Sequence, residues 1–244
     1  MKKVTLMIVL VGLTVGTVSA TTWFERKTKC PICKTTNKLQ AIGSYGSYIY
    51  SWPEKFEYIY WPVTETYCLY TCKKCKYSAF MWDFSEMGKD TLKIIKNALP
   101  ELKLPASKYS DNMTKKLESA ELIYKLYNHN PDFWCKFYRI KGYHYEAEGN
   151  IEQAKIERLK ALAIADSLLS VPDNDYRKKE LLFITSSMKH FTNQDSESIK
   201  DIDLALSLTY NNPNIDQEKN SGFDSYLTRL LNELKMKIIG KENE

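Results

Sequence analysis

The stretch Cys30-Pro31-Ile32-Cys33 and the later stretch Cys72-Lys73-Lys74-Cys75 decide how the first part of this chain folds. Each is a CxxC turn, or knuckle, which lets two sulfurs converge on one ion. Two knuckles supply the four soft ligands that tetrahedral Zn²⁺ takes, so we interpret Cys30, Cys33, Cys72 and Cys75 as a structural zinc site. Because four thiolates leave no coordination position for water or substrate, such a site stabilises the fold and performs no chemistry.

Two other kinds of cysteine chemistry stay open. The chain has six cysteines, including Cys68 and Cys135, and in an exported protein four or six of them could form disulfides. Alternatively, Cys30 and Cys33 could serve a thiol-disulfide oxidoreductase, because Cys-Pro-x-Cys occurs in thioredoxin-like enzymes. Zinc is favoured because paired CxxC turns match metal-ligand spacing, whereas the residues after Cys33 are a weak helix start and no βαβ pattern surrounds them.

Residues 1–20 have the features of a secretory signal peptide. Lys2 and Lys3 precede an apolar run, and Val18-Ser19-Ala20 suits cleavage after Ala20. The run is interrupted by threonine and glycine and is shorter than the roughly 20 residues that a spanning helix needs. We therefore expect an exported protein, periplasmic or secreted, with no stable membrane span after cleavage. An uncleaved anchor is the alternative, and a lipoprotein is disfavoured because no cysteine follows Ala20.

The charge balance offers little attraction to polyanions. The formal net charge of +5 includes Lys2 and Lys3, which cleavage would remove. Four thiolates on one Zn²⁺ would add more negative than positive charge, which leaves a nearly neutral protein. We therefore expect no nucleic-acid partner.

Aromatic residues between the knuckles favour β-strands. They include Tyr45, Tyr48, Tyr50, Trp52, Tyr58, Tyr60, Trp61, Tyr67 and Tyr70. Tyr48 alternates with Tyr50, and Tyr58 with Tyr60, while glycine and proline punctuate the stretch, so we expect short antiparallel strands joined by turns. Residues 21–86 would form a zinc-ribbon-like head whose aromatic side chains pack around a small metal-anchored core. A platform that binds a glycan or a peptide is the alternative.

Residues 87–244 carry the apolar spacing of amphipathic helices, so the fold class is α+β and mainly α. We expect helices over residues 89–99, from about Asp111, from about Phe133 to Gly149, after Asn150, and over residues 223–239. Asn150 followed by Gln153 is a capping-box pattern. The last helix has an apolar stripe and is interpreted as a cap over the preceding helices, a membrane-surface helix being the alternative. The stripe consists of Leu227, Leu230, Leu231, Leu234 and Ile238.

Part of the helical region resembles a tetratricopeptide repeat. The small, aromatic and turn positions of that motif are matched by Gly142, Tyr145, Gly149, Ala154 and Ala161. Arg158 departs from the motif, because a large apolar residue is usual there. A degenerate second copy covers residues 176–210. Such repeats stack into an array with a concave face, and we expect a protein or peptide partner to bind along the face that carries Tyr138 and Tyr145.

The knuckles and the helices together resemble a bacterial family of unknown function. In that family a CPxC knuckle pairs with a CxxCGYAA-like one, and here the second knuckle runs into Lys76-Tyr77-Ser78-Ala79-Phe80. Lys76 stands where glycine is usual. The resemblance implies a zinc-ribbon head followed by helical repeats, and it implies no established activity.

No catalytic constellation stands out in the sequence. The three histidines lie outside the metalloprotease, nucleophile-elbow and P-loop motifs. His144, Glu146 and Glu148 do not share one helix face, so they make a poor ligand set. We therefore predict a non-enzymatic interaction module; a thiol-disulfide oxidoreductase and a disulfide-stapled protein that binds a glycan or peptide are the alternatives.

Overall fold

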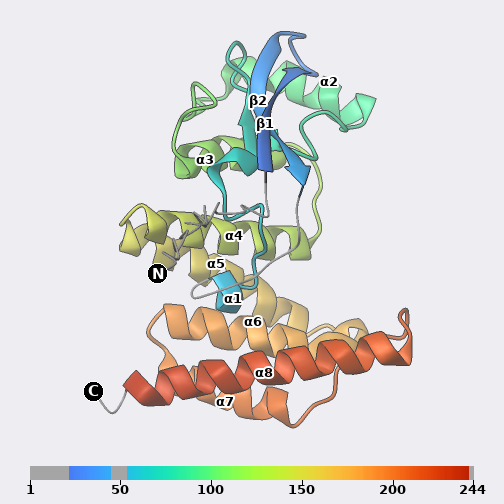
Figure 1. Ribbon diagram of the computed structural model, residues 1–244, viewed down its shortest axis with the longest axis vertical. Helices are drawn as coiled ribbons and strands as arrows, with labels where there is room; N and C mark the ends of the chain where they lie inside the picture. The colour runs from blue at the N-terminus through green and yellow to red at the C-terminus, as the bar shows by residue number, and fades with distance from the viewer. Residues whose placement is uncertain (1–21, 45–53, 242–244) are drawn as a thin grey trace, which may run out of the picture.

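The computed structural model describes residues 22–44 and 54–241. The expected signal peptide, residues 1–20, lies outside the described residues, as do Tyr48 and Tyr50. The described part of the chain contains two small β-hairpins and eight α-helices, seven of which follow the second hairpin, so the expected α+β, mainly helical fold class is confirmed (Figure 1).

Each cysteine knuckle forms the turn of one antiparallel hairpin. Strands β1 (Thr22–Lys29) and β2 (Thr36–Ser44) flank the first knuckle, and β3 (Leu69–Thr71) and β4 (Ser78–Phe80) flank the second. The hairpins belong to separate two-stranded sheets. A two-stranded hairpin alone is marginally stable in water, so these hairpins need additional anchoring.

The segment between the hairpins is mostly irregular. It contains only the short helix α1 (Glu54–Glu57) and the 3₁₀ helix η1 (Thr66–Cys68). The expected strand at Tyr58 and Tyr60 is wrong: Tyr58 follows α1 with a left-handed backbone (φ 55°). Its ring packs edge-on against Phe183, far along the chain, at a centroid distance of 5.8 Å. Contact with the helical body, rather than with a neighbouring strand, therefore sets this conformation.

Helices make up the rest of the chain. They are α2 (Lys89–Ala98), η2 (Leu99–Glu101), α3 (Met113–Tyr124), α4 (Pro131–Ala147), α5 (Ile151–Leu169), η3 (Pro172–Arg177), α6 (Lys178–Phe191), α7 (Asp195–Leu206) and α8 (Gln217–Lys241). Asn112, Asn130 and Asn150 cap α3, α4 and α5, each accepting from a first-turn amide. Only half of the expected capping box forms, because the Gln153 side chain donates to Glu157 instead of reaching back to Asn150.

Helices α4 and α5 form one helical hairpin, and α6 and α7 form another. Both turn through a left-handed residue, Gly149 (φ 80°) and Asn193 (φ 64°). Helix α8 covers the second hairpin with the expected stripe from Leu227 to Ile238, and all five stripe residues are fully buried. None of the helices in the described residues is long and apolar enough to cross a membrane.

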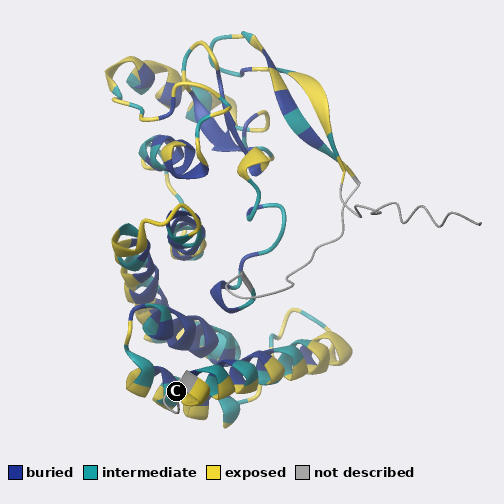
Figure 2. Ribbon diagram, turned by 60° about the vertical axis from the view of Figure 1, so that its left-hand side comes forward, coloured by how far each residue is buried: buried dark blue, intermediate teal, exposed yellow. Residues whose placement is uncertain are grey.

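The hydrophobic core joins the head to the helices. One cluster runs from Cys30 in the head to Ile140 in α4. In a second cluster, Phe56 of α1 packs with residues of α6, α7 and α8. Figure 2 shows the helices along an arc, with α1 on its inner side. Helix α1 contacts α4, α6 and α8 there, so the chain's own segment occupies the inner side of the array.

Three helical side chains hold the irregular segment by its backbone carbonyls. The Lys116 ammonium donates to Thr66 O, and the Arg139 guanidinium donates to Glu57 O (2.8 Å). His144 Nε2 lies 2.8 Å from Val63 O and serves as its donor when protonated. All three side chains are buried. Because a buried carbonyl without a partner costs free energy, these contacts let an irregular segment pack inside the protein.

Candidate metal centre

The four predicted ligands come together at one point. Their Sγ atoms all lie within 4.8 Å of one another, and no other group of metal-ligating residues forms in the described part of the chain. The Sγ atoms of Cys30 and Cys75 are 3.6 Å apart, and those of Cys33 and Cys72 are 3.5 Å apart. Tetrahedral coordination at about 2.3 Å from sulfur to metal requires sulfur separations of about 3.8 Å. The cluster could therefore hold a metal ion with only small shifts.

The two knuckles have the same backbone geometry. In each, the amide following the second cysteine donates to the carbonyl of the first: Lys34 N to Cys30 O and Lys76 N to Cys72 O, both at 2.9 Å. Lys34 and Lys76 both adopt left-handed backbones, with φ of 61° and 64°. Glycine reaches this region without steric cost, which explains why glycine suits the position of Lys76 in the resembling family.

Asn37 bridges the two knuckles, and the sequence analysis missed it. Its side-chain amide donates to Thr35 O (3.0 Å) beside the first knuckle and to Cys72 Sγ (3.7 Å) in the second. Its carbonyl oxygen accepts from Lys73 N (3.0 Å). The residue is buried. A polar residue just after a knuckle, at an inward-facing strand position, was the only signal for this role in the sequence.

Burial and thiol contacts set the electrostatics of the cluster. Cys30 and Cys72 are fully buried, and Cys33 and Cys75 are half-buried. Hydrogen bonds from Cys30 and Cys75 lower the pKa of Cys72 far below that of a free thiol. Hydrogen bonds with Cys30 and Cys72 raise the pKa of Cys75 strongly. The pKa of Cys33 is lowered as well, since the effect of burial is outweighed by hydrogen bonds, including those from Thr35. Cys30 and Cys75 are therefore the two thiols whose ionisation calls for a nearby cation.

Cys68 and Cys135 lie apart from this cluster. All six cysteines are free thiols. Cys68 is buried in the head core, where burial raises the pKa of its thiol to about 12. Cys135 Sγ lies 3.5 Å from Ala161 O in the α4–α5 contact. Burial also raises the pKa of Cys135, so both residues behave as small apolar side chains.

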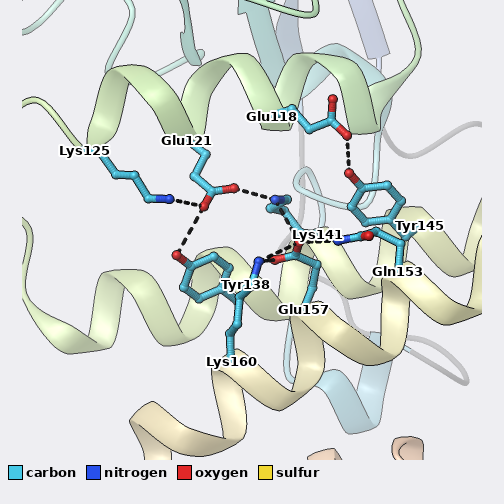
Figure 3. A network of polar contacts seen from close by, with 9 residues as sticks. All are labelled: Glu118, Glu121, Lys125, Tyr138, Lys141, Tyr145, Gln153, Glu157 and Lys160. Carbon is cyan, nitrogen blue, oxygen red and sulfur yellow. Dashed lines mark hydrogen bonds and ion pairs between the residues drawn. The ribbon is translucent and has the colours of Figure 1, made fainter.

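The face expected to bind a partner takes part in a polar network between α3, α4 and α5 (Figure 3). Tyr138 donates to Glu121 of α3 at 3.3 Å, and Tyr145 donates to Glu118 of the same helix. Buried Lys141 pairs with Glu121 (2.5 Å) and with Glu157 of α5 (3.1 Å). The network therefore fastens α3 to the first helical hairpin.

His144, Glu146 and Glu148 point to three different partners. Besides the contact of His144 with Val63, Glu146 pairs with Arg158 at 2.5 Å. Glu148 accepts from the hydroxyl of Thr114 at 2.7 Å. They form no ligand set, as expected from their spacing on the helix.

The fold and the site define a mainly helical protein whose four-cysteine β head could hold a metal ion. A family described as an uncharacterized protein conserved in bacteria (DUF2225) matches residues 23–156, which is more than half of the chain. The protein therefore belongs to this bacterial family, which confirms the resemblance. The matched region includes both knuckles and ends within α5. No curated protein and no solved structure matches the chain.

Proposed function

We propose that the protein is an exported, non-enzymatic interaction module whose head is held together by structural Zn²⁺. The observation that carries this proposal is the convergence of Cys30, Cys33, Cys72 and Cys75, two fully buried and two half-buried. Four thiolates fill a tetrahedral shell and leave no position for a substrate. The knuckles are the turns of two short hairpins, which are too small to be stable alone. A metal ion bound to both turns would supply the missing stability.

Sulfur ligands select the metal. Thiolates favour zinc over hard cations such as Mg²⁺ and Ca²⁺, although a set of four cysteines also suits iron. Structural Zn²⁺ contributes about 10–16 kcal/mol in small zinc-binding peptides, enough to decide whether a small domain folds. Asn37 supports this role, because a hydrogen bond to a ligand sulfur orients it and offsets its charge.

The redox alternative finds less support in the geometry. An attacking thiolate in a Cys-x-x-Cys enzyme is accessible and has a lowered pKa. Cys30 is fully buried, and its hydrogen bond with Cys72 raises its pKa to about 12. The knuckle leads into strand β2 rather than into a helix whose N-terminus would stabilise a thiolate.

The helical hairpins support an interaction role. Their equivalent turns at Gly149 and Asn193 fit a tetratricopeptide-like array, in which neighbouring hairpins stack and leave extended surfaces for partners. The inner side of the arc already holds α1, so we place a protein partner on the outer surface or on the head. On α5, the apolar side chains of Ile156 and Leu159 are 47% and 41% exposed, which suits a protein contact.

The proposal is tested by measuring zinc and free thiols on protein purified without reductant or chelator. One zinc per chain is expected, with Cys33 and Cys75 protected from alkylation until a chelator is added. Insulin-reduction activity should be absent. Few free thiols without metal would support the disulfide alternative instead, and insulin reduction that disappears in Cys30→Ser would establish the oxidoreductase.

A matched variant separates the cluster from the other thiols. Cys68→Ala changes a buried cysteine outside the cluster and should leave the zinc content at one per chain. Cys33→Ala removes one proposed ligand and should lower zinc retention. Equal zinc content in both variants would contradict the assignment. For export, N-terminal sequencing of the secreted or periplasmic protein should begin at Thr21.

A further inference from the structure

The outer edge of β2 is covered by two tyrosine hydroxyls. The backbone N–H of Gln40 donates to the Tyr109 hydroxyl at 3.2 Å, and the Tyr70 hydroxyl donates to Gln40 O at 2.7 Å. Both backbone groups of Gln40 therefore point away from β1. In an antiparallel pair of strands, hydrogen-bonded residue pairs alternate with non-hydrogen-bonded pairs. Gln40 therefore belongs to a non-hydrogen-bonded pair.

The outer edge of β1 has no such cover in the described part of the chain. Glu25 faces Gln40 in the register, so the alternation turns the N–H and C=O groups of Glu25, Lys27 and Lys29 away from β2. No backbone hydrogen bond joins these groups to another described segment. Figure 2 shows β1 as the largely exposed, outer strand of its hairpin. It is thus an edge onto which another strand can pair.

A groove of about 460 Å³ lies along this strand. Residues 26–29 of β1 line it, together with Tyr70, Trp82 and Glu86. Trp82 is 43% exposed and offers an apolar surface inside the groove. Ala41 and Ile42 of β2 also line it, so the groove crosses one face of the hairpin and reaches the exposed strand β1.

The charge of the groove is mostly positive. Arg26, Lys27 and Lys29 are all exposed, and none of them belongs to an ion pair within the described residues. The nearby pair of Glu25 with Lys38 (2.9 Å) uses a different lysine. Among the described residues that line the groove, Glu86 is the only acidic one. A ligand that carries carboxylates is therefore complementary to this surface.

We propose that the outer edge of β1, beside this groove, binds an acidic protein segment in extended conformation, which adds a third strand to the β1–β2 sheet. Backbone groups that point outward at every second residue match the repeat of another strand, which a nucleic acid or a glycan does not reproduce. Lys27 and Lys29, which share one face of β1, meet carboxylates on that face of the added strand, and Trp82 packs on its apolar side chains. The inference rests on the proposed interaction role and assigns it a surface and a partner chemistry.

The test uses an acetylated and amidated nonapeptide of alternating valine and glutamate, titrated into the purified protein at neutral pH. Lys27→Pro removes an outward N–H and puts a ring where the added strand would lie. It leaves the β1–β2 ladder intact, because that N–H does not bond to β2. Lys27→Ala is the matched control, since it removes the same charge and keeps the N–H.

We expect the peptide to shift the amide resonances of Lys27 and Lys29 and to change tryptophan fluorescence. Lys27→Pro should weaken binding by roughly tenfold or more, the factor that corresponds to about 1.4 kcal/mol. Lys27→Ala should weaken it by no more than about threefold, as for other exposed charges. If Lys27→Pro loses zinc or its circular dichroism signal, Trp82→Ala decides instead. That variant should keep the fold and weaken binding, since Trp82 is partly exposed.

Three results would overturn the inference: equal weakening by Lys27→Pro and Lys27→Ala, equal binding of a valine–lysine peptide of the same length, or no binding by the unsubstituted protein. The zinc content and thiol protection of the protein are measured on the same samples. If they match the proposed structural site while the peptide fails to bind, the failure concerns this groove and not the metal-stabilised, non-enzymatic role.

Discussion

Arg158 of α5 and Glu57 of α1 form an ion pair in the interior of the protein. Arg158 Nη2 lies 2.5 Å from Glu57 Oε1, and the side chains are 3% and 0% exposed. Arg158 also pairs with Glu146 and lies over the ring of Phe191, 4.3 Å from its centroid. Arg158 is the residue that departs from the tetratricopeptide pattern. At this position the arginine binds Glu57 of α1, the segment that lies on the inner side of the array.

Breaking this pair from one side should be costly. Arg158→Leu restores the apolar residue that is usual in the repeat, but it leaves the carboxylate of Glu57 buried without its main partner. We expect a loss of about 3–5 kcal/mol in the free energy of unfolding. In the double variant Glu57→Met, Arg158→Leu most of this loss should be recovered. Urea unfolding of the single and double variants measures the coupling, and additive effects would contradict it.

Lys141 offers a comparison between a buried and an exposed partner of the same carboxylate. Lys141 is 3% exposed and pairs with Glu121 and Glu157, whereas Lys125 is 53% exposed and pairs with Glu121 alone. Lys141→Met leaves two buried carboxylates without their shared cation, and we expect a loss of about 3 kcal/mol or more. Lys125→Met should cost no more than about 0.5 kcal/mol. Thermal unfolding checks both, and similar losses would refute the burial argument.

His144 should make the stability depend on pH. Burial, aided by the charge of Lys116, lowers its pKa from 6.5 to about 4, although its contact with Val63 opposes the shift. The folded protein therefore disfavours the imidazolium. The contribution of His144 is fully present above pH 6.5 and is lost as the pH falls toward 4, by up to about 3 kcal/mol.

The comparison with His144→Gln isolates this contribution, because the glutamine amide can still donate to Val63 O but does not titrate. The difference in unfolding free energy between the two proteins should change between pH 6.5 and 4. Loss of metal in acid affects both proteins alike and cancels in the difference. A difference that stays constant over this range would show that His144 does not titrate as described.

Asn37 should raise the affinity of the cysteine cluster for zinc. Asn37→Asp keeps the acceptor for Lys73 N but replaces the donor to Cys72 Sγ with a negative charge. We expect zinc affinity to fall by roughly 10- to 100-fold, as for other residues that orient metal ligands. Competition with a chromophoric chelator measures the affinity. Unchanged zinc affinity would show that Asn37 does not act on the cysteine cluster and only bonds to the backbone of Thr35 and Lys73.

Gly142 is required by the side chain of Arg158. A Cβ atom at Gly142 would lie 2.8 Å from Arg158 Cγ, whereas a Cβ atom at Gly222 in α8 would meet nothing within 4 Å. Gly142→Ala should therefore destabilise the protein by about 1–3 kcal/mol through overpacking. Gly222→Ala should stabilise it by up to about 1 kcal/mol, because alanine favours a helix. Chemical denaturation of both variants provides the measurement, and a stabilised Gly142→Ala would contradict the contact.

Local patterns in the sequence were enough to predict the knuckles and most helices. Each CxxC turn is specified by a few adjacent residues, and the apolar stripe of α8 follows from helical periodicity alone. The asparagine caps act within one turn of helix, so Asn150 was readable as well. Where a competing contact existed, local reasoning failed: Gln153 donates to Glu157 on the next turn and does not complete the capping box.

The sequence by itself determined where most of the helices lie, which cysteines are paired in turns, and which helix faces are apolar. Only the tertiary structure decided what lies against those faces. Glu57 and Arg158 are separated by 101 positions, and Asn37 and Cys72 by 35. Hydrophobic periodicity predicts that a helix face is buried, but it does not predict which segment packs against that face. The position of α1 inside the arc follows from long-range packing and charge pairing, which local sequence patterns do not encode.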